Sequence, residues 1–489
     1  METIYYHSTN NTKEKASFET ALMNGLASNY GLYMISKKDI PQLPSSILKS
    51  LNGMAYAQIA FEVLNPFLGA EIPEEDLRLM LDDAYDDSVI PTNLQHLTGQ
   101  TYIIWLTQGP TYSFKDYAAR FFGRMLNYFL EQSGKKRIVA VATSGDTGGA
   151  VADALHGLKS VENIVFFPKG SITERQRRQM TTLGDNIYAF EVNGDFDVCQ
   201  ALAKRLLGDK AFAEDLFDDA HRFTSANSIS VGRLLPQAVY PFFAYSRVAE
   251  YDEPMIASVP SGNFGDMMGT VLAREMGLPI EKIICGVNEN DEFPEFLNTD
   301  VYVVKPSRKS PSSAMIVSNP SNFARLIDLY GGHVYDERDE TGNVIREGVM
   351  DVLPDLDAMR RDFWSISVSN PDHYLAIEEV YNRYGVMMEP HGAVGWHALD
   401  SFLKGRHDRL AVIYETADPG KFPDEVKKAV GVIPNVPERI ARQAKLSERI
   451  YTIDDPPHSR KDGSLTVSED QYNTAKKIIS EDIYAEGEN

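Results

Sequence analysis

The apolar residues that follow residue 113 recur at the spacing of one buried helical face. These residues are Phe114, Ala118, Phe121, Phe122 and Met125. Because an α-helix completes a turn in about 3.6 residues, side chains three or four positions apart lie on the same side of it. Residues 108–111, Gln-Gly-Pro-Thr, have the composition of a turn. The pattern therefore predicts a helix that begins near Lys115, at the end of the turn.

Two stretches further along the chain share a pattern of strand, loop and helix. The first begins with a β-branched run at residues 138–142 and continues through a Gly-rich loop at 144–149 into helix-forming residues. The second has its strand at 255–259, its loop at 260–266 and its helix at 267–276. Further strand-like runs occupy residues 164–167, 283–287 and 410–414. Strands that alternate with helices predict an α/β fold with parallel sheets.

The loops of the two stretches have the same local pattern, Ser-Gly-(Asp or Asn)-x-Gly. It is Ser-Gly-Asp-Thr-Gly at residues 144–148 and Ser-Gly-Asn-Phe-Gly at 261–265. Two similar units more than a hundred residues apart suggest two α/β domains that face one cleft. We expect a mostly helical N-terminal region before them and a polar tail after them. The expected boundaries are 1–100, 101–250, 251–436 and 437–489.

Length and composition narrow the class of protein. A chain of 489 residues is too long for a single hydrophobic core. The formal charge of −22 argues against nucleic acid as a partner, since phosphates require a basic surface. An anionic substrate would instead need a local basic pocket.

No apolar run reaches membrane-spanning length, and neither a secretory nor a transit segment is recognisable. The two cysteines, Cys199 and Cys285, offer no disulfide framework and no metal-ligand spacing. We therefore expect a cytoplasmic protein without a membrane partner or a metal.

A Gly-rich loop that opens a helix favours anion binding, because free backbone N–H groups and the positive end of the helix point at the ligand. Neither loop fits the Walker pattern or the dinucleotide G-x-G-x-x-G spacing, so a phosphate is expected and a nucleotide is not. Lys115 alone is most simply an exposed lysine. Together with the two loops, it points to a phosphorylated aldehyde, pyridoxal phosphate (PLP), whose carbonyl a lysine amine can attack.

Several longer motifs resemble those of the PLP-dependent threonine synthases, of the longer kind found in fungi and many bacteria. They are GPTYSFKD, ATSGDTGG, RRQMTTLGDN, NSIS with GRLLPQ, VPSGNFGD, NEND and TADPGKFPDEV, in order across nearly the whole chain. The resemblance implies PLP fold type II, similar to the tryptophan synthase β subunit, with two α/β domains around a cofactor cleft. It implies a carbon–oxygen lyase, monomeric or homodimeric, that converts O-phospho-L-homoserine and water to L-threonine and phosphate.

The resemblance also implies roles for individual residues. Lys115 is the Schiff-base and catalytic lysine, which moves protons between Cα and Cβ. Thr416 meets the pyridine nitrogen, and Asp146 lies near the ring hydroxyl. The residues expected around the cofactor phosphate are Gly262, Asn263, Phe264, Gly265 and Asp266. Those expected to bind substrate are Thr143, Ser144 and Thr147 at the carboxylate, and Asn227 and Arg233 at the phosphate.

Alternatives stay open at this point. Thr416 could be a strand-end hydroxyl bonded to backbone, and Arg233 a surface ion pair. A serine/threonine dehydratase of the same fold would not need Arg233, and a non-catalytic protein could bind PLP or phosphate as a partner. Gly392, Asp418 and Gly420 depart from the usual family pattern.

His391 and His373 are the remaining histidines that invite a role. Neither lies near a carboxylate or a serine in a nucleophile elbow, so a hydrolase triad is not expected. We interpret both as core or rim histidines.

Overall fold

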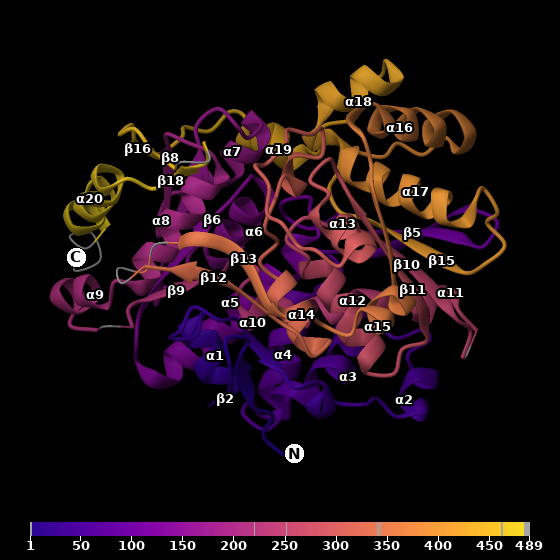
Figure 1. Ribbon diagram of the computed structural model, residues 1–489, viewed down its shortest axis with the longest axis horizontal. Helices are drawn as coiled ribbons and strands as arrows, with labels where there is room; N and C mark the ends of the chain where they lie inside the picture. Colours follow the sequence, from indigo (N-terminus) through magenta and orange to yellow (C-terminus); the bar gives the residue numbers. More distant parts are fainter. Residues whose placement is uncertain are drawn as a thin grey trace.

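Two sheets, each between layers of helices, form the body of the protein (Figure 1). The computed structural model describes residues 2–219, 221–250, 252–339, 342, 344–460 and 463–483. The α/β architecture predicted from the alternation of strands and helices is confirmed.

The larger sheet has six strands in the order β14-β11-β10-β15-β5-β4. Its strands are β4 (Asn93–Thr98), β5 (Thr101–Trp105), β10 (Met255–Pro260), β11 (Ile280–Val287), β14 (Phe363–Ser367) and β15 (Ala411–Glu415). All neighbours are parallel except β4, which forms an antiparallel pair with β5. Alternate residues enter different cores: Val412 packs on the side of α12 (Gly265–Glu275) and Ile413 on the side of α17 (Pro390–Leu403). Burial on both faces explains why these strands are apolar throughout.

The smaller sheet has five parallel strands in the order β16-β8-β7-β6-β9. Its strands are β6 (Arg137–Ala142), β7 (Val161–Pro168), β8 (Ile187–Val192), β9 (Phe223–Ser225) and β16 (Ile450–Ile453). The helices that follow its strands are α6 (Asp146–Leu155), α7 (Glu174–Thr181), α8 (Phe196–Gly208) and α9 (Lys210–Phe217). The helix α6 begins inside the loop predicted for residues 144–149, because Thr143 caps its first turn.

The first 85 residues form a cap at the bottom of the molecule in Figure 1. Its helices are α1 (Phe18–Asn24), α2 (Ser45–Ser50), α3 (Tyr56–Leu68) and α4 (Glu74–Ala84). A small antiparallel sheet accompanies them, made of β1 (Tyr6–Ser8), β2 (Asn11–Ala16) and β3 (Tyr33–Ile35). Helices hold more residues than strands in this region but fewer than half of the total, and the small sheet was not predicted from the sequence.

The remaining elements connect and cover the two sheets. The helices are α5 (Lys115–Ser133), α10 (Val231–Leu234), α11 (Val239–Val248), α13 (Glu292–Thr299), α14 (Phe323–Leu329), α15 (Leu356–Asp362), α16 (Asn370–Tyr384), α18 (Pro423–Val430), α19 (Glu438–Gln443) and α20 (Glu469–Ile478). Two antiparallel hairpins are β12 (His333–Arg338) with β13 (Val344–Val352), and β17 (His458–Ser459) with β18 (Leu465–Thr466). No helix in the described part of the chain is both long and apolar enough to cross a bilayer.

Sheet membership does not follow the expected domain boundaries. The strands β4 and β5 lie before residue 110 but belong to the sheet of the second half, because β5 pairs with β15. The strand β16 lies in the expected polar tail but completes the sheet of the first half beside β8. Ile453 and Tyr472 of this tail are buried in the core of that sheet. Although the tail is polar on average, its few apolar residues pack into the core beside the smaller sheet and hold the tail there.

Candidate active site

Lys115 is the first residue of α5, as the spacing of apolar residues predicts. Two backbone contacts tie the turn before it to the end of β15. The N–H of Phe114 donates to the carbonyl oxygen of Thr416 at 2.9 Å, and Ser113 forms an isolated bridge with Ala417. These contacts bring Lys115 close to Thr416 despite their distance in sequence.

A cavity of about 60 Å³ surrounds Lys115 where the carboxyl ends of strands from both sheets meet. This is the usual place for ligands in parallel α/β sheets. Twelve of the thirteen predicted site residues line it: Lys115, Thr143, Ser144, Asp146, Thr147, Asn227, Arg233, Gly262, Asn263, Gly265, Asp266 and Thr416. They lie at the start of α5, on α10, and in the loops and first helical turns that follow β6, β9, β10 and β15.

Phe264 is the predicted residue that does not line the cavity with its side chain. Its ring is buried in an aromatic cluster with Phe293, at 5.1 Å between centroids, and with Phe323. Its backbone has φ of 60°, a left-handed conformation unusual for an aromatic residue. This turn aims the side chain into the core, so Phe264 can contribute only its backbone N–H to a ligand.

The loop at 262–265 is built to receive an anion. Within the described residues, the backbone N–H groups of Gly262, Asn263, Phe264 and Gly265 donate no hydrogen bond. They stand at the N-terminal end of α12, where the helix dipole favours negative charge. A Cβ on Gly262 would lie 2.9 Å from the Cα of Met315, so glycine is required by the neighbouring backbone. Such a cradle fits the phosphate of a cofactor.

The other Gly-rich loop is held by Thr143. Its Oγ1 accepts hydrogen bonds from the N–H groups of Gly145 and Gly148, both at 2.9 Å. Gly145 has φ of 134°, a conformation that residues with a Cβ rarely adopt, and a Cβ there would clash with Gln176 Nε2. The hydroxyls of Ser144 and Thr147 line the cavity, and neither has a hydrogen bond to any described residue. Thr143 is therefore structural in this geometry, whereas Ser144 and Thr147 are free to bind a ligand.

Lys115 lies in an unusual electrostatic environment. Burial lowers the pKa of Lys115 to about 8, although Asp146 and Asp266 oppose this shift. Burial also raises the pKa of Asp266 to about 6. A lysine with so low a pKa is partly neutral near physiological pH and can act as a nucleophile or a base.

Asp146 is held by two partners that the sequence analysis did not identify. Lys421 Nζ lies 2.5 Å from Asp146 Oδ1, and Gln176 Nε2 donates to the same oxygen at 3.0 Å. Burial would raise the pKa of Asp146, but Lys421 and Lys115 together lower it to about 2. Lys421 is fully buried and also donates to the carbonyl oxygen of Thr111 at 2.9 Å. In the sequence, the only indication of a role for Lys421 was its place in the TADPGKFPDEV motif.

Arg233 is buried in the cavity wall without a carboxylate partner among the described residues. Its Nη1 donates to the carbonyl oxygen of Ala226 at 2.7 Å, and its buried Nε has no hydrogen-bond partner. Burial lowers the pKa of Arg233 to about 10, so the guanidinium stays charged at neutral pH. An unpaired buried cation in a cavity is suited to an anionic ligand. The surface ion pair considered as an alternative for Arg233 is therefore wrong.

Asn227 lines the same wall, but its amide is used by the fold. Its Oδ1 accepts from the N–H of Ala142 at 3.0 Å, and its Nδ2 donates to the carbonyl oxygen of Ala142 at 2.6 Å. This pair of bonds joins the end of β6 to the segment after β9. Only the second N–H of the amide remains for a ligand.

His391 lines the cavity, and the expectation that no carboxylate lies near it is wrong. Its Nδ1 hydrogen-bonds Glu389, two residues earlier, and its Nε2 accepts from the N–H of Ala314 at 3.1 Å. This pairing leaves it no serine to activate, so a hydrolase triad is still excluded. His373 is a core histidine, hydrogen-bonded to Ser312 at 3.0 Å and to the carbonyl oxygen of Ser369 at 2.8 Å.

Family models match three successive parts of the chain: "Threonine synthase N terminus" at residues 5–85, "Pyridoxal-phosphate dependent enzyme" at 89–414 and "Threonine synthase, C-terminal" at 392–461. The threonine synthase of Pseudomonas aeruginosa is 33% identical over 456 residues, which cover 92% of this chain and 95% of that protein. The chain belongs to the threonine synthase family.

Two further relatives support the threonine synthase assignment. The threonine synthase of Saccharomyces cerevisiae is 31% identical, with 92% of this chain and 95% of that protein covered. The crystal structure of PLP-bound threonine synthase from Brucella melitensis matches with a TM-score of 0.85, at 30% identity and full coverage of both chains. The fold is therefore PLP fold type II, and the cofactor is PLP. The free N–H groups at 262–265 and the low pKa of Lys115 fit that cofactor.

Proposed function

We propose that this enzyme converts O-phospho-L-homoserine and water to L-threonine and phosphate, and that Arg233 recognises the substrate phosphate. The observation that carries the proposal is the presence of two separate places for anions in one cavity. The backbone N–H groups at 262–265 suit the cofactor phosphate. The unpaired guanidinium of Arg233 suits a second phosphate, which serine and threonine lack.

The other residues of the cavity have roles that follow from their free polar groups. Ser144 and Thr147 have hydroxyls available for the substrate carboxylate. Thr416, which lines the same cavity, would present a neutral hydroxyl to the ring nitrogen of the cofactor. When bound, PLP withdraws electrons from the substrate carbons and makes their C–H bonds acidic.

Lys115 is the group proposed to move protons. Its amine holds the cofactor at rest and carries protons between Cα and Cβ of the substrate, while phosphate leaves from Cγ and water adds at Cβ. A pKa of about 8 suits both the acceptance and the release of a proton near neutral pH. Asp146 is already paired with Lys421, so it acts as a fixed negative charge rather than as a second base. We also propose a cytoplasmic location, consistent with the two buried, unpaired cysteines, Cys199 and Cys285.

The experiment that tests this function compares substrates with and without a phosphate. In Arg233→Ala, turnover of phosphohomoserine should lose a charge-assisted contact worth roughly 2–5 kcal/mol. Any turnover of serine or threonine should change little, and the visible spectrum of the bound cofactor should be retained. Arg233→Lys should restore only part of the loss, because an ammonium cannot make the two-pronged contact of a guanidinium.

Equal losses with phosphorylated and unphosphorylated substrates would assign Arg233 a structural role and favour the serine/threonine dehydratase. Loss of cofactor from both variants would instead show that Arg233 supports the cofactor site. The gel-filtration and circular-dichroism behaviour of each variant must match the parent enzyme for the comparison to hold.

A further inference from the structure

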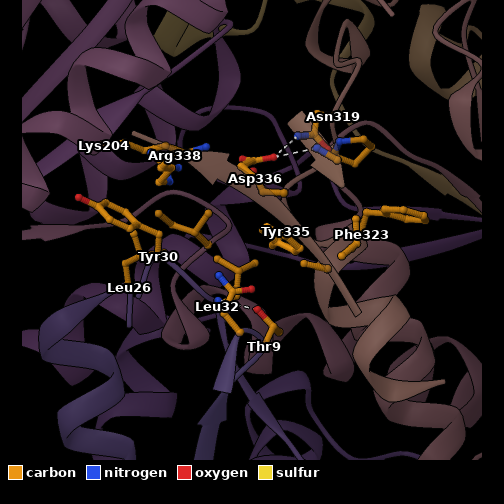
Figure 2. Close-up of a pocket in the computed structure, with 17 residues that line it drawn as sticks. Thr9, Leu26, Tyr30, Leu32, Lys204, Asn319, Phe323, Tyr335, Asp336 and Arg338 are labelled. Carbon is orange, nitrogen blue, oxygen red and sulfur yellow. Dashed lines mark hydrogen bonds between the residues drawn. The ribbon is translucent and has the colours of Figure 1, made fainter. Parts of the chain in front are cut away.

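A second cavity lies where the N-terminal cap, α8 and the β12–β13 hairpin meet (Figure 2). Its volume is about 70 Å³, against 60 Å³ for the active-site cavity. The two cavities share no lining residue. A water molecule needs roughly 10–15 Å³ by this kind of measure, so the second cavity has room for a small organic molecule.

The floor of this cavity is largely apolar, with Thr9 beside Leu32, and its upper wall is charged (Figure 2). The apolar residues are Leu26, Leu32, Ile229, Phe323, Ala324 and Val334. Lys204, Arg338 and Asp336 supply two positive charges and one negative charge. This mixture suits a molecule with an apolar body and charged groups at one end.

The positive side of the wall has unused hydrogen-bond donors. Figure 2 shows Lys204 and Arg338 on the same side of the cavity, with Tyr30 below them. The guanidinium of Arg338 lies over the ring of Tyr30 at 4.3 Å, and its buried Nε has no hydrogen-bond partner. The ammonium of Lys204 forms no hydrogen bond or ion pair with any described residue. Burial lowers the pKa of Lys204, and the negative charge of Asp336 is the largest influence that opposes this shift.

The negative side of the wall has an unused acceptor. Asp336 Oδ1 accepts from Asn319 Nδ2 at 3.0 Å and from the N–H of Gly348 at 3.1 Å. These two bonds fix the carboxylate on β12. In the described part of the chain, its Oδ2 accepts no hydrogen bond. Among the described residues, the cavity therefore presents an ammonium and a carboxylate oxygen that have no partner.

We propose that this cavity is a binding site for a small zwitterionic α-amino acid with an apolar side chain. The ligand carboxylate is held by Lys204 and Arg338, its ammonium by Asp336, and its side chain by the apolar floor. A monoanion without an ammonium would leave Asp336 unpaired, and an amine without a carboxylate would leave Lys204 unpaired. Both charges of the ligand are needed.

Two short segments link this cavity to the active site. Ser228 lines the active site, and the next residue, Ile229, lines the second cavity. Ser321 lines the second cavity, and its N–H donates to Asn263 Oδ1 in the active-site loop at 3.3 Å. Arg325, which is fully buried, donates to the carbonyl oxygens of both Ser228 and Ile229. A ligand that orders these segments would change the affinity of the active site, and substrate would change that of the cavity by the same factor.

The test is titration of the holoenzyme with L-alanine, L-valine and L-isoleucine by calorimetry, with the visible spectrum recorded in parallel. A free amino acid that enters the active site perturbs the cofactor spectrum, whereas one in the second cavity does not. We expect saturable heat without a spectral change. The L-valine methyl ester and 3-methylbutanoate, which lack the carboxylate charge and the ammonium respectively, should give none.

Variants at Lys204 and Asp336 test whether the binding heat measured by calorimetry comes from this cavity. Lys204→Met and Asp336→Asn should each weaken L-valine binding at least tenfold while basal turnover is unchanged. The exposed Lys159 offers the matched control Lys159→Met, which should bind as the parent does. No heat from any of the three amino acids at ~10 mM, which would largely fill a site of millimolar affinity, would overturn the proposal. Full retention of L-valine binding by both Lys204→Met and Asp336→Asn would also overturn it. These outcomes do not depend on which reaction the active site catalyses.

Discussion

The carboxyl group of Glu415 occupies the space into which a side chain at Gly392 would project. Glu415 is fully buried, and its Oε1 accepts from the N–H of Glu389 at 3.2 Å. Burial and the neighbouring Glu389 raise the pKa of Glu415 well above its usual range, so it is a neutral acid. Any larger residue at position 392, where the sequence departs from the family pattern, would clash with this side chain. Gly392 and Glu415 are therefore a matched pair.

Gly392→Thr should destabilise the enzyme by about 1–3 kcal/mol, because it overpacks a buried site. Combined with Glu415→Ser, which clears the space, the same change should cost markedly less than the sum of the two single changes. Urea denaturation of the four proteins gives the coupling free energy. Simple additivity would show that the two positions are independent.

Lys421→Met should be strongly destabilising at pH 7, by roughly 3–5 kcal/mol, because Asp146 is left charged and buried without its partner. The loss should shrink as the pH falls towards 5, since Asp146 can then take up a proton. Denaturation midpoints across this pH range measure both effects. Lys169→Met is the matched control: Lys169 forms an exposed pair with Asp454 at 2.8 Å, which should contribute little at any pH.

In the parent enzyme, the contribution of Asp146 to the free energy of unfolding should decrease as the pH falls. The pKa of Asp146 is about 2 in the folded protein, below the ordinary value of roughly 3.9 in an unfolded chain. Its contribution to stability is therefore complete above about pH 4 and is lost as the pH falls towards 2. Asp146→Asn should flatten this part of the stability curve. An unchanged acid limb in that variant would contradict the low pKa.

Lys115→Ala should abolish covalent attachment of the cofactor and turnover. Borohydride reduction of the parent holoenzyme should attach a pyridoxyl group to the peptide that contains Lys115, and a label on any other lysine would contradict the assignment. Because burial lowers the pKa of Lys115 to about 8, attachment of PLP to apoenzyme should speed up with pH and level off above that value. Free Nα-acetyl-lysine, as a control, should continue to gain rate towards pH 10.

Gly262→Ala should reduce retention of PLP more than Gly265→Ala does. A Cβ at Gly262 would meet the backbone Cα of Met315 at 2.9 Å, whereas one at Gly265 would meet the amide end of Gln237 at the same distance. A side-chain amide can move aside more easily than a backbone atom. Cofactor content after dialysis measures the difference, and thermal unfolding of the apoenzymes checks that folding is intact. The reverse order would show that Gln237 is the less movable neighbour.

Much of the architecture could be predicted from the sequence because its signals are local. The apolar spacing placed the start of α5 at Lys115, and the β-branched runs located β6, β7, β10, β11 and β15. The repeated Ser-Gly-x-x-Gly pattern identified the two loops that meet in the cavity. These features depend on neighbouring residues, which a single sequence displays.

The features that the sequence analysis missed depend on contacts between distant residues. Lys421 lies in the turn after β15 and meets Asp146 at the start of α6, although the two residues are far apart in the sequence. The pairing of β5 with β15 and of β16 with β8 moved the sheet boundaries away from those expected from chain order. Phe264 turns its ring into the core through a left-handed backbone, although its neighbours in the loop face the cavity. None of these relationships has a periodicity of its own, and the motif that contains Lys421 does not show which residue it meets.

The insertion of β15 between β10 and β5 also has a consequence for biosynthesis. Until residues 411–415 leave the ribosome, roughly 15 to 60 s after β5 at ordinary elongation rates, both β5 and β10 have an open edge that can pair with other nascent chains. Over the same interval Lys115 lacks the neighbouring end of β15 and Asp146 lacks Lys421. Cofactor capture must therefore follow translation of nearly the whole chain, and misassembly through those open edges is a hazard for as long as they stay unpaired.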